Sequence, residues 1–152
     1  MRISEKGILL IKRWEGFSAD PYICPAGVVT IGYGNTYYEN GVKIKMSDPP
    51  INEKRADAML RNIVRHYELG VDSMTRDDIT QNQFDALVSF AYNVGLEAFR
   101  KSTLLKKVNA NPNDRLISNQ FLRWNKSRGR VLQGLTKRRI EEARIYFAHL
   151  NG

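Results

Sequence analysis

The stretch that decides the fold is residues 14–35, WEGFSADPYICPAGVVTIGYGN. It begins where an apolar helical stripe ends, and Gly16 can take the left-handed conformation that terminates a helix. A β-branched run at 28–31 follows, with glycines on both sides of it. Short runs of this kind between glycines are typical of small antiparallel sheets with tight turns. The stretch therefore predicts that a first helix leads into a small β-sheet.

A helix is expected before this stretch and a longer one after it. Ser4 is the expected N-cap of the first helix. The β pattern continues with a second run at 36–38, until two adjacent prolines at 49–50 close it. Asn52 is then expected to cap a helix that runs to about residue 71. Its length suits a connector between two lobes.

The second half of the chain has helical patterns only. Thr80 and Gln83 form a capping-box pattern before an apolar stripe that ends at Gly95. Thr136 is the expected N-cap of a basic final helix. Shorter helices are expected between these two, at residues 97–100, 103–108 and 114–124.

These patterns predict an α+β fold, a single domain of two lobes over residues 1–152. The N-terminal lobe, about 13–52, holds a short antiparallel β-sheet. A long connecting helix leads to an all-helical C-terminal lobe, about 70–152, which the helix at 3–12 completes. A chain of this length can bury a core without disulfides.

The charge of the chain is basic and uneven. The 24 Lys and Arg residues outnumber the 16 Asp and Glu residues, and twelve of the former but only three of the latter lie in residues 101–152. Such an excess indicates a polyanionic partner. One alternative is a nucleic-acid-binding helical module around the basic residues of 126–139, but no motif of a nucleic-acid reader is present. Another is a membrane-disrupting basic helix at 136–150.

Metal and cofactor chemistry is not expected. The two histidines, His66 and His149, are far apart and have no partner at ligand spacing. The glycines at 32–34 are not followed by the Lys-Ser/Thr pair of a phosphate loop. The single cysteine, Cys24, has no histidine near it in the sequence to serve as its base. We therefore expect neither a metal ion nor a cofactor.

Glu15 is the candidate general acid. It follows Trp14 and precedes Phe17, so its carboxyl group is expected near aromatic surface. Burial against apolar groups raises the pKa of a carboxyl group and lets it hold a proton near neutral pH. The alternative is a glutamate at a helix end that meets only solvent.

Three blocks of sequence resemble a known family. Glu15, Cys24 and Thr30 are separated by eight and five residues. The segment around them resembles the active site of the phage lysozymes of glycoside hydrolase family 24, in which a Glu is followed at these intervals by Asp, in some members Cys, and by Thr. Residues 81–95 and 134–142 resemble the central buried helix and the closing helix of the family. The resemblance thus covers essentially the whole chain.

The resemblance implies a lysozyme-like fold and an endolysin. Its activity would be that of a muramidase, which hydrolyses the β-1,4 bond between N-acetylmuramic acid and N-acetylglucosamine in bacterial peptidoglycan during phage-driven host lysis. Glu15 would be the general acid, and Thr30 would hold a water molecule. Cys24 would be a nucleophile, a water-positioning group or a weak stabiliser, which leaves inverting and retaining chemistry open. Asp20 is the rival second carboxylate, and we favour a turn role for it.

Further residues are expected from the resemblance to line the sugar cleft. Asn35 and Phe99 occupy such positions, and Gly32 and Gly34 would let the backbone bend beside the cleft. Core packing is the equal alternative for Phe99, and it is the expected role of Trp124.

The expected partner is peptidoglycan, bound by a monomer, with no nucleic acid. The longest apolar run near the start of the sequence is Ile8–Ile11, too short for a membrane span or an export signal. The enzyme is therefore expected in the host cytoplasm until a holin releases it to the periplasmic cell wall. Some relatives carry an N-terminal signal-anchor, and the sequence leaves open whether one has been removed.

Overall fold

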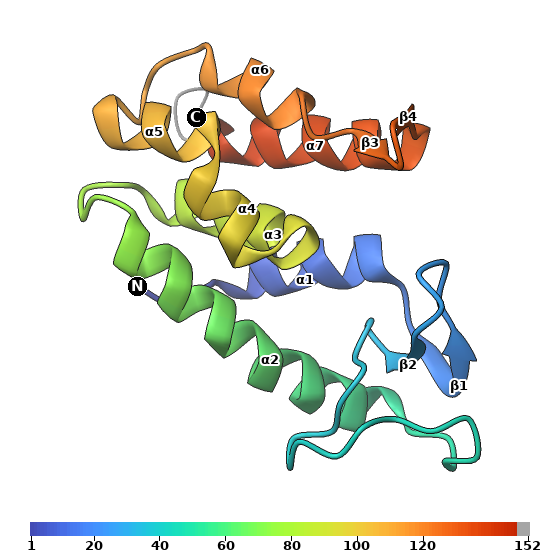
Figure 1. Ribbon diagram of the computed structural model, residues 1–152. Helices are drawn as coiled ribbons and strands as arrows, with labels where there is room; N and C mark the ends of the chain where they lie inside the picture. The colour runs from blue at the N-terminus through green and yellow to red at the C-terminus, as the bar shows by residue number, and fades with distance from the viewer. Residues whose placement is uncertain (149–152) are drawn as a thin grey trace. The chain divides into compact units, whose positions relative to one another are not determined.

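The computed structural model describes residues 1–148, shown as a ribbon in Figure 1. The chain divides into two compact units. The sheet unit is Ile8–His66, and the helical unit is Met1–Gly7 together with the chain from Tyr67 onward. Two helices pass from one unit to the other: α1 (Glu5–Glu15) and the long α2 (Glu53–Met74). His149, named above, lies outside the described residues.

Both ends of α1 form as the sequence predicts. The Ser4 hydroxyl oxygen accepts a hydrogen bond from the Gly7 N–H at 3.3 Å, as an N-cap does. At the other end Gly16 has a φ of +72°, and its N–H donates to the Lys12 carbonyl at 2.9 Å. This left-handed residue turns the chain directly after Glu15.

The sheet of the sheet unit has two antiparallel strands, β1 (Ser18–Ile23) and β2 (Val29–Gly32). The β2 strand is predicted from the sequence, but β1 is not, because Pro21 argues against a strand. Pro21 is tolerated because the pairing is irregular between Ser18 and Tyr22, where no ladder hydrogen bond is required of it.

The strand predicted at 36–38 is wrong. Only one isolated bridge forms there, between Tyr37 and Lys43. A tight turn follows at once, in which the Tyr38 N–H donates to the Val42 carbonyl at 2.9 Å. Tyr38 instead packs on the small core formed by three buried residues of this unit, Ile31, Ile44 and Met59.

The helical unit contains five further helices, which are α3 (Gln81–Val94), α4 (Leu96–Lys101), α5 (Thr103–Ala110), α6 (Ile117–Leu122) and α7 (Gln133–Tyr146). The capping box predicted at the start of α3 is confirmed. The Thr80 side chain accepts from the Gln83 N–H, and the Gln83 side chain accepts from the Thr80 N–H. Phe90 of α3 is fully buried and has the edges of Phe99, Phe121 and Trp124 around it at centroid distances of 5.5–6.2 Å.

Two predictions for the helical unit are wrong. It is not all-helical, because a hairpin of β3 (Lys126–Ser127) and β4 (Arg130–Val131) precedes α7. The two turn residues between these strands, Arg128 and Gly129, both have positive φ, as in the tight turns of hairpins. Thr136 is not the N-cap of α7 either, because the helix begins three residues earlier and the Thr136 hydroxyl donates to the Leu132 carbonyl at 3.2 Å.

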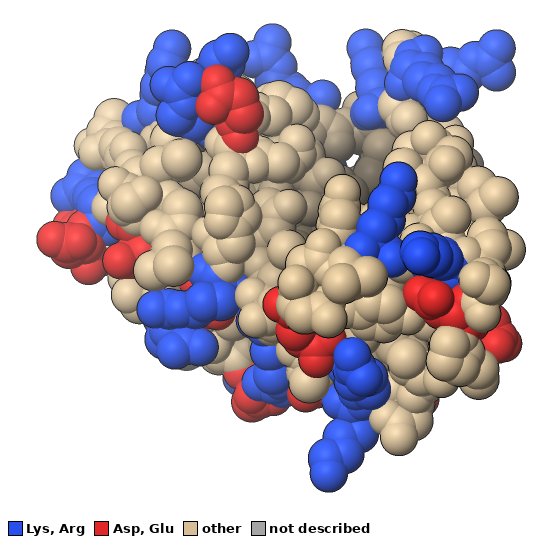
Figure 2. All heavy atoms as spheres, turned by 60° about the horizontal axis from the view of Figure 1, so that its bottom comes forward, with Lys and Arg blue, Asp and Glu red and all other residues tan. Residues whose placement is uncertain are grey.

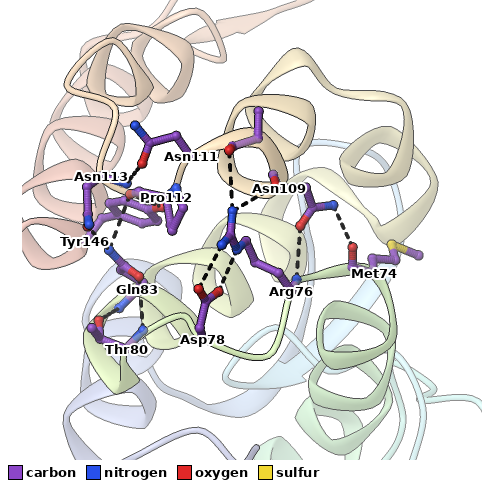
Figure 3. A network of polar contacts seen from close by, with 11 residues as sticks. Met74, Arg76, Asp78, Thr80, Gln83, Asn109, Asn111, Pro112, Asn113 and Tyr146 are labelled. Atoms are coloured by element: carbon purple, nitrogen blue, oxygen red, sulfur yellow. Dashed lines mark hydrogen bonds and ion pairs between the residues drawn. The ribbon is translucent and has the colours of Figure 1, made fainter.

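The loops of the helical unit are tied together by a polar network (Figure 3). Arg76 forms two hydrogen bonds with the Asp78 carboxylate, at 2.5 and 2.8 Å, and donates to the Asn109 carbonyl at 3.1 Å. The Tyr146 hydroxyl of α7 donates to the Pro112 carbonyl at 2.8 Å. Burial raises the pKa of this phenol well above its usual value.

Candidate active site

Glu15 is the last residue of α1 and is half-buried. The turn at Gly16 brings the chain from Glu15 directly into β1. An open hollow of about 310 Å³ lies there, lined by residues 15–18 and by Tyr22 of β1. The structure therefore places the candidate acid at the wall of a solvent-accessible hollow, beside aromatic side chains.

Cys24 and Thr30 lie on the same side of the β1–β2 hairpin. Tyr22 pairs with Thr30 across the two strands, and side chains alternate between the two faces of a strand. Tyr22, Thr30 and Cys24 thus share one face, while Ile23 between them is 60% exposed. The turn after β1 is closed by the Cys24 N–H, which donates to the Val28 carbonyl at 3.0 Å.

The surroundings of Cys24 favour its charged form. The cysteine is free and half-buried. The Val28 N–H, which hydrogen-bonds to the sulfur, is the largest factor that lowers the pKa of the thiol, and the Ala26 N–H and the Thr30 hydroxyl add to it. Desolvation opposes them but does not cancel them. A lower pKa increases the thiolate fraction near neutral pH.

Tyr22 connects Cys24 with Glu15 electrostatically. Burial raises the pKa of the Tyr22 phenol, and the negative charges of Cys24 and of Glu15 raise it further. Both candidate groups are therefore close enough to the same phenol to act on its ionisation. Within the sheet unit, Glu15, Cys24 and Thr30 are brought together around Tyr22.

Asn35 and the two glycines before it shape the end of the hairpin. Asn35 is buried, its amide nitrogen donates to the Met59 carbonyl at 3.3 Å, and its side-chain oxygen is buried without a partner among the described residues. Gly32 has a φ of +65°, and a Cβ there would come within 3.3 Å of the Ala56 Cβ. Gly34 also has a positive φ, of +87°. The glycines are thus required by backbone geometry and close packing.

Phe99 and Trp124 belong to the helical unit. Phe99 is completely buried and packs on Phe90 at a centroid distance of 6.2 Å, so the structure favours its core-packing alternative. Trp124 contacts Phe90 but is only half-buried. It also lines an open hollow of about 360 Å³, a feature that the sequence did not indicate; the other lining residues are Lys101, Ser102, Thr103, Gln120 and Arg123.

Asp20 lies on β1 and is exposed. Its backbone carbonyl accepts a hydrogen bond from the Ser18 hydroxyl at 2.7 Å. This local hydrogen bond agrees with the turn role that we favoured for this segment.

One charged pair near Glu15 was missed at the level of sequence. The Lys12 ammonium of α1 lies 2.5 Å from the Asp57 carboxylate of α2. The two residues are 45 positions apart, so no local pattern could have paired them.

No group of three or more His, Cys, Asp or Glu residues that could hold a metal ion is found within residues 1–148. Over the same range, none of the helices has both the length and the apolar character to cross a membrane.

Comparisons with known proteins agree with this geometry. The family model described as phage lysozyme matches residues 12–142. The endolysin of Bacillus phage B103 is 45% identical over 148 residues, which are 96% of this chain and 54% of that protein. The chain thus spans about half the length of this relative.

Solved structures are similar over nearly their whole length. The endolysin from Escherichia coli O157:H7 phage FAHEc1 has a TM-score of 0.90 and 35% identity, with 98% of this chain and 95% of that chain covered. The muramidase domain of SpmX from Asticcacaulis excentricus, printed as Asticaccaulis excentricus, has a TM-score of 0.82 and 33% identity, with 95% and 97% covered. The match over residues 12–142 includes Glu15, Cys24 and Thr30, and the chain belongs to the phage lysozyme family.

Proposed function

We propose that this chain is a muramidase that hydrolyses the β-1,4 bond between N-acetylmuramic acid and N-acetylglucosamine in peptidoglycan. The observation that carries the proposal is the meeting of Glu15, Cys24 and Thr30 around Tyr22, at a hollow in a chain of the phage lysozyme family. The similarity to phage endolysins supports a role in host lysis.

Glu15 would donate a proton to the leaving glycosidic oxygen. Hydrolysis of a glycoside passes through an oxocarbenium-like transition state, and protonation of the leaving oxygen lets the bond break. A general acid must be protonated before it acts and close to the scissile bond. The place of Glu15 at the wall of the hollow supports this role.

Thr30 and Cys24 would act on the attacking water. The Thr30 hydroxyl has one proton, which it donates either to the Val28 carbonyl, 3.0 Å away, or to the Cys24 sulfur. When it donates to the thiolate, its lone pairs can accept from a water molecule. The water would attack the anomeric carbon and pass a proton to the thiolate, which gives inversion of configuration. A sulfur that already accepts hydrogen bonds is a weaker nucleophile, and this favours the water mechanism over direct attack.

The rival readings of the basic residues lose support. Arg138 and Arg139 are 4% and 0% exposed and form ion pairs with the buried Glu142, so they are not available to a nucleic acid. On the face shown in Figure 2, Lys and Arg side chains lie in separate groups with Asp and Glu among them. In the described part of 136–150, the buried residues of α7 also hold the helix to the protein, unlike a free membrane-binding helix.

Two parts of the proposal concern the cell. The protein would act on the wall as a monomer, and lysis from inside a host would depend on a holin. Light scattering of the purified protein and lysis curves with and without a co-expressed holin would measure the two separately.

The decisive experiment is analysis of digested peptidoglycan. New reducing ends at muramic acid would support the proposal, whereas reducing ends at glucosamine or released peptides would overturn it. The anomeric configuration of the first product separates the two roles of Cys24, since the water mechanism inverts it and a covalent cysteine intermediate retains it. In a turbidity assay on permeabilised bacteria, Asp20→Asn should remain active and Cys24→Ser should not.

A further inference from the structure

A fixed charge cluster lies one helical turn before Glu15. The Asp57 carboxylate is held by two cations, one on each oxygen. Lys12 Nζ is 2.5 Å from Oδ1, and Arg61 Nε is 2.8 Å from Oδ2. The Lys12 and Asp57 side chains are only 21% and 31% exposed. Because Arg61 and Lys12 both hold it, the Asp57 carboxylate stays ionised, and the pKa of Asp57 is lowered accordingly.

An aromatic ring holds Lys12 from a second side. The ammonium lies 5.3 Å from the centroid of the Tyr33 ring, a cation–π distance. Tyr33 is buried, and its ring packs at 5.6 Å on Phe17, which lines the same hollow as Glu15. Lys12 is thus enclosed by Asp57 and Tyr33 directly behind the wall of the candidate site.

Helix geometry makes the position of Lys12 important for Glu15. Residues three apart on a helix are surface neighbours, with Cβ atoms roughly 5–6 Å apart. Lys12 and Glu15 have this spacing on α1. A lysine free to turn toward Glu15 would stabilise its carboxylate form, and a general acid in that form has no proton to give.

We propose that Asp57 is a positioning residue that holds the Lys12 ammonium away from Glu15, so that Glu15 keeps its proton until it reaches the glycosidic oxygen. This inference rests on the proposed function of Glu15. Asp57 touches no substrate in this account and acts only through Lys12.

The other charged groups near Glu15 in the sheet unit act differently. Tyr22 and Cys24 face it from the side of β1, and a Cys24 thiolate disfavours a second negative charge at Glu15. Asp20 of β1 is exposed. Arg13 is two positions from Glu15 on α1 and so does not lie on the same side of the helix. Lys12 is therefore the cation of α1 whose release would change the protonation of Glu15.

The test is the pH dependence of kcat/KM on purified peptidoglycan. In Asp57→Asn, the alkaline limb should move down by about one pH unit, because an opposite charge at this range lowers the pKa of a carboxyl group by about that much or more. In the double variant Asp57→Asn with Lys12→Met, the limb should return to its original position. Asp57→Glu, which keeps the charge, should also retain it. Asp78→Asn is the matched control, since Asp78 is an arginine-held aspartate of the helical unit, and it should leave the limb in place.

A purely structural role of Asp57 would lower the rate without moving the limb. That result, or a limb that stays shifted in the double variant, would overturn the proposal. A ¹³C NMR titration of the Glu15 carboxyl in the same variants reads the shift without turnover and so does not depend on the amount of active protein. Failure of the proposed function is seen separately, as an unmodified protein that releases no muramic acid ends.

Discussion

At Cys24, three hydrogen-bond donors meet one sulfur. Two are backbone N–H groups of the turn, at Val28 and Ala26, and the third is the Thr30 hydroxyl on the facing strand. A hairpin turn thus does for this thiol what a cation does at other reactive cysteines: it stabilises the thiolate. The spacing of Glu15, Cys24 and Thr30 is visible in the sequence, but the donors around the sulfur follow only from the turn geometry.

We expect the Cys24 thiol to react with iodoacetamide at a lower pH than an ordinary cysteine does. The lowered pKa means that thiolate is present above that pKa and is lost as the pH falls through it. The alkylation rate as a function of pH measures the midpoint. Thr30→Val should move the midpoint upward because it removes one donor, whereas Ser18→Ala, a hydroxyl lost elsewhere on the hairpin, should not. An unchanged midpoint in Thr30→Val would contradict the hydrogen bond to the sulfur.

Glu15→Gln should reduce peptidoglycan hydrolysis by about 10²- to 10⁴-fold, because general acid catalysis is worth about that much. The amide cannot donate a proton as an acid does, yet it keeps the size of the side chain. Reducing ends released per minute give the rate. Glu97→Gln is the control, since Glu97 is an exposed glutamate of α4 that pairs with Arg100. Lysis by Glu15→Gln at the normal rate would exclude Glu15 as the acid.

At the scale of elements, two threonines with similar sequence surroundings have different roles. Thr80 has extended backbone angles, φ −79° and ψ 167°, and caps α3 through its side chain. Thr136 lies inside α7, which begins directly after the β3–β4 hairpin. The hairpin delivers the chain to the helix in extended form at Leu132, so the helix starts there and does not use the threonine. A tertiary feature therefore overrides a local capping preference.

This difference predicts the stability of two variants. Thr80→Ala should lower the free energy of unfolding by about 1 kcal/mol, because it removes the capping hydrogen bond to the Gln83 N–H. Thr136→Ala, its matched control, should change it by less, since an interior helical position favours alanine. Urea denaturation of both variants measures the two values. Equal losses would show that the side-chain cap contributes nothing specific.

At the scale of the whole molecule, the basic charge divides into a buried and an exposed part. Arg138 and Arg139 of α7 form ion pairs with Glu142, which also accepts a hydrogen bond from Ser89 of α3 at 2.6 Å. Arg139 lies 4.9 Å from the centre of the Phe90 ring as well. Desolvation raises the pKa of Glu142, and the two arginines oppose this. These charges fasten α7 to α3, and only the exposed remainder can attract a cell wall.

Removal of Glu142 should therefore be costly. Glu142→Ala leaves two buried guanidinium groups without their carboxylate and should lower the free energy of unfolding by about 3–5 kcal/mol. Glu97→Ala removes a 65% exposed carboxylate and should change it by about 0–1 kcal/mol. Thermal unfolding of both variants gives the comparison. Similar melting temperatures would show that the buried network contributes little to stability.

The net charge of +8 predicts that wall lysis weakens as salt is added. The screening length falls from about 30 Å at 0.01 M to about 8 Å at 0.15 M, so long-range attraction to an anionic wall is lost. Rates on whole peptidoglycan should fall over this range, while rates on a short uncharged chitin-type oligosaccharide, if it is cleaved, should not. Equal salt dependence on both substrates would place the effect in the site itself.

The sequence by itself determined the features that depend on neighbouring residues. The caps at Ser4 and Thr80 and the turn at Gly16 are local hydrogen bonds and local backbone angles, and residues close in the chain specify them. The same holds for the spacing of Glu15, Cys24 and Thr30 along one short stretch.

Only the tertiary structure decided the features that join distant parts of the chain. Strand β1 forms despite Pro21 because β2 pairs with it around an irregular register. Arg139 is buried because α3 and Glu142 surround it, although its sequence segment is among the most basic. The pairing of Lys12 with Asp57 spans 45 residues. Burial and charge pairing depend on which surfaces meet, and that is a property of the folded chain as a whole.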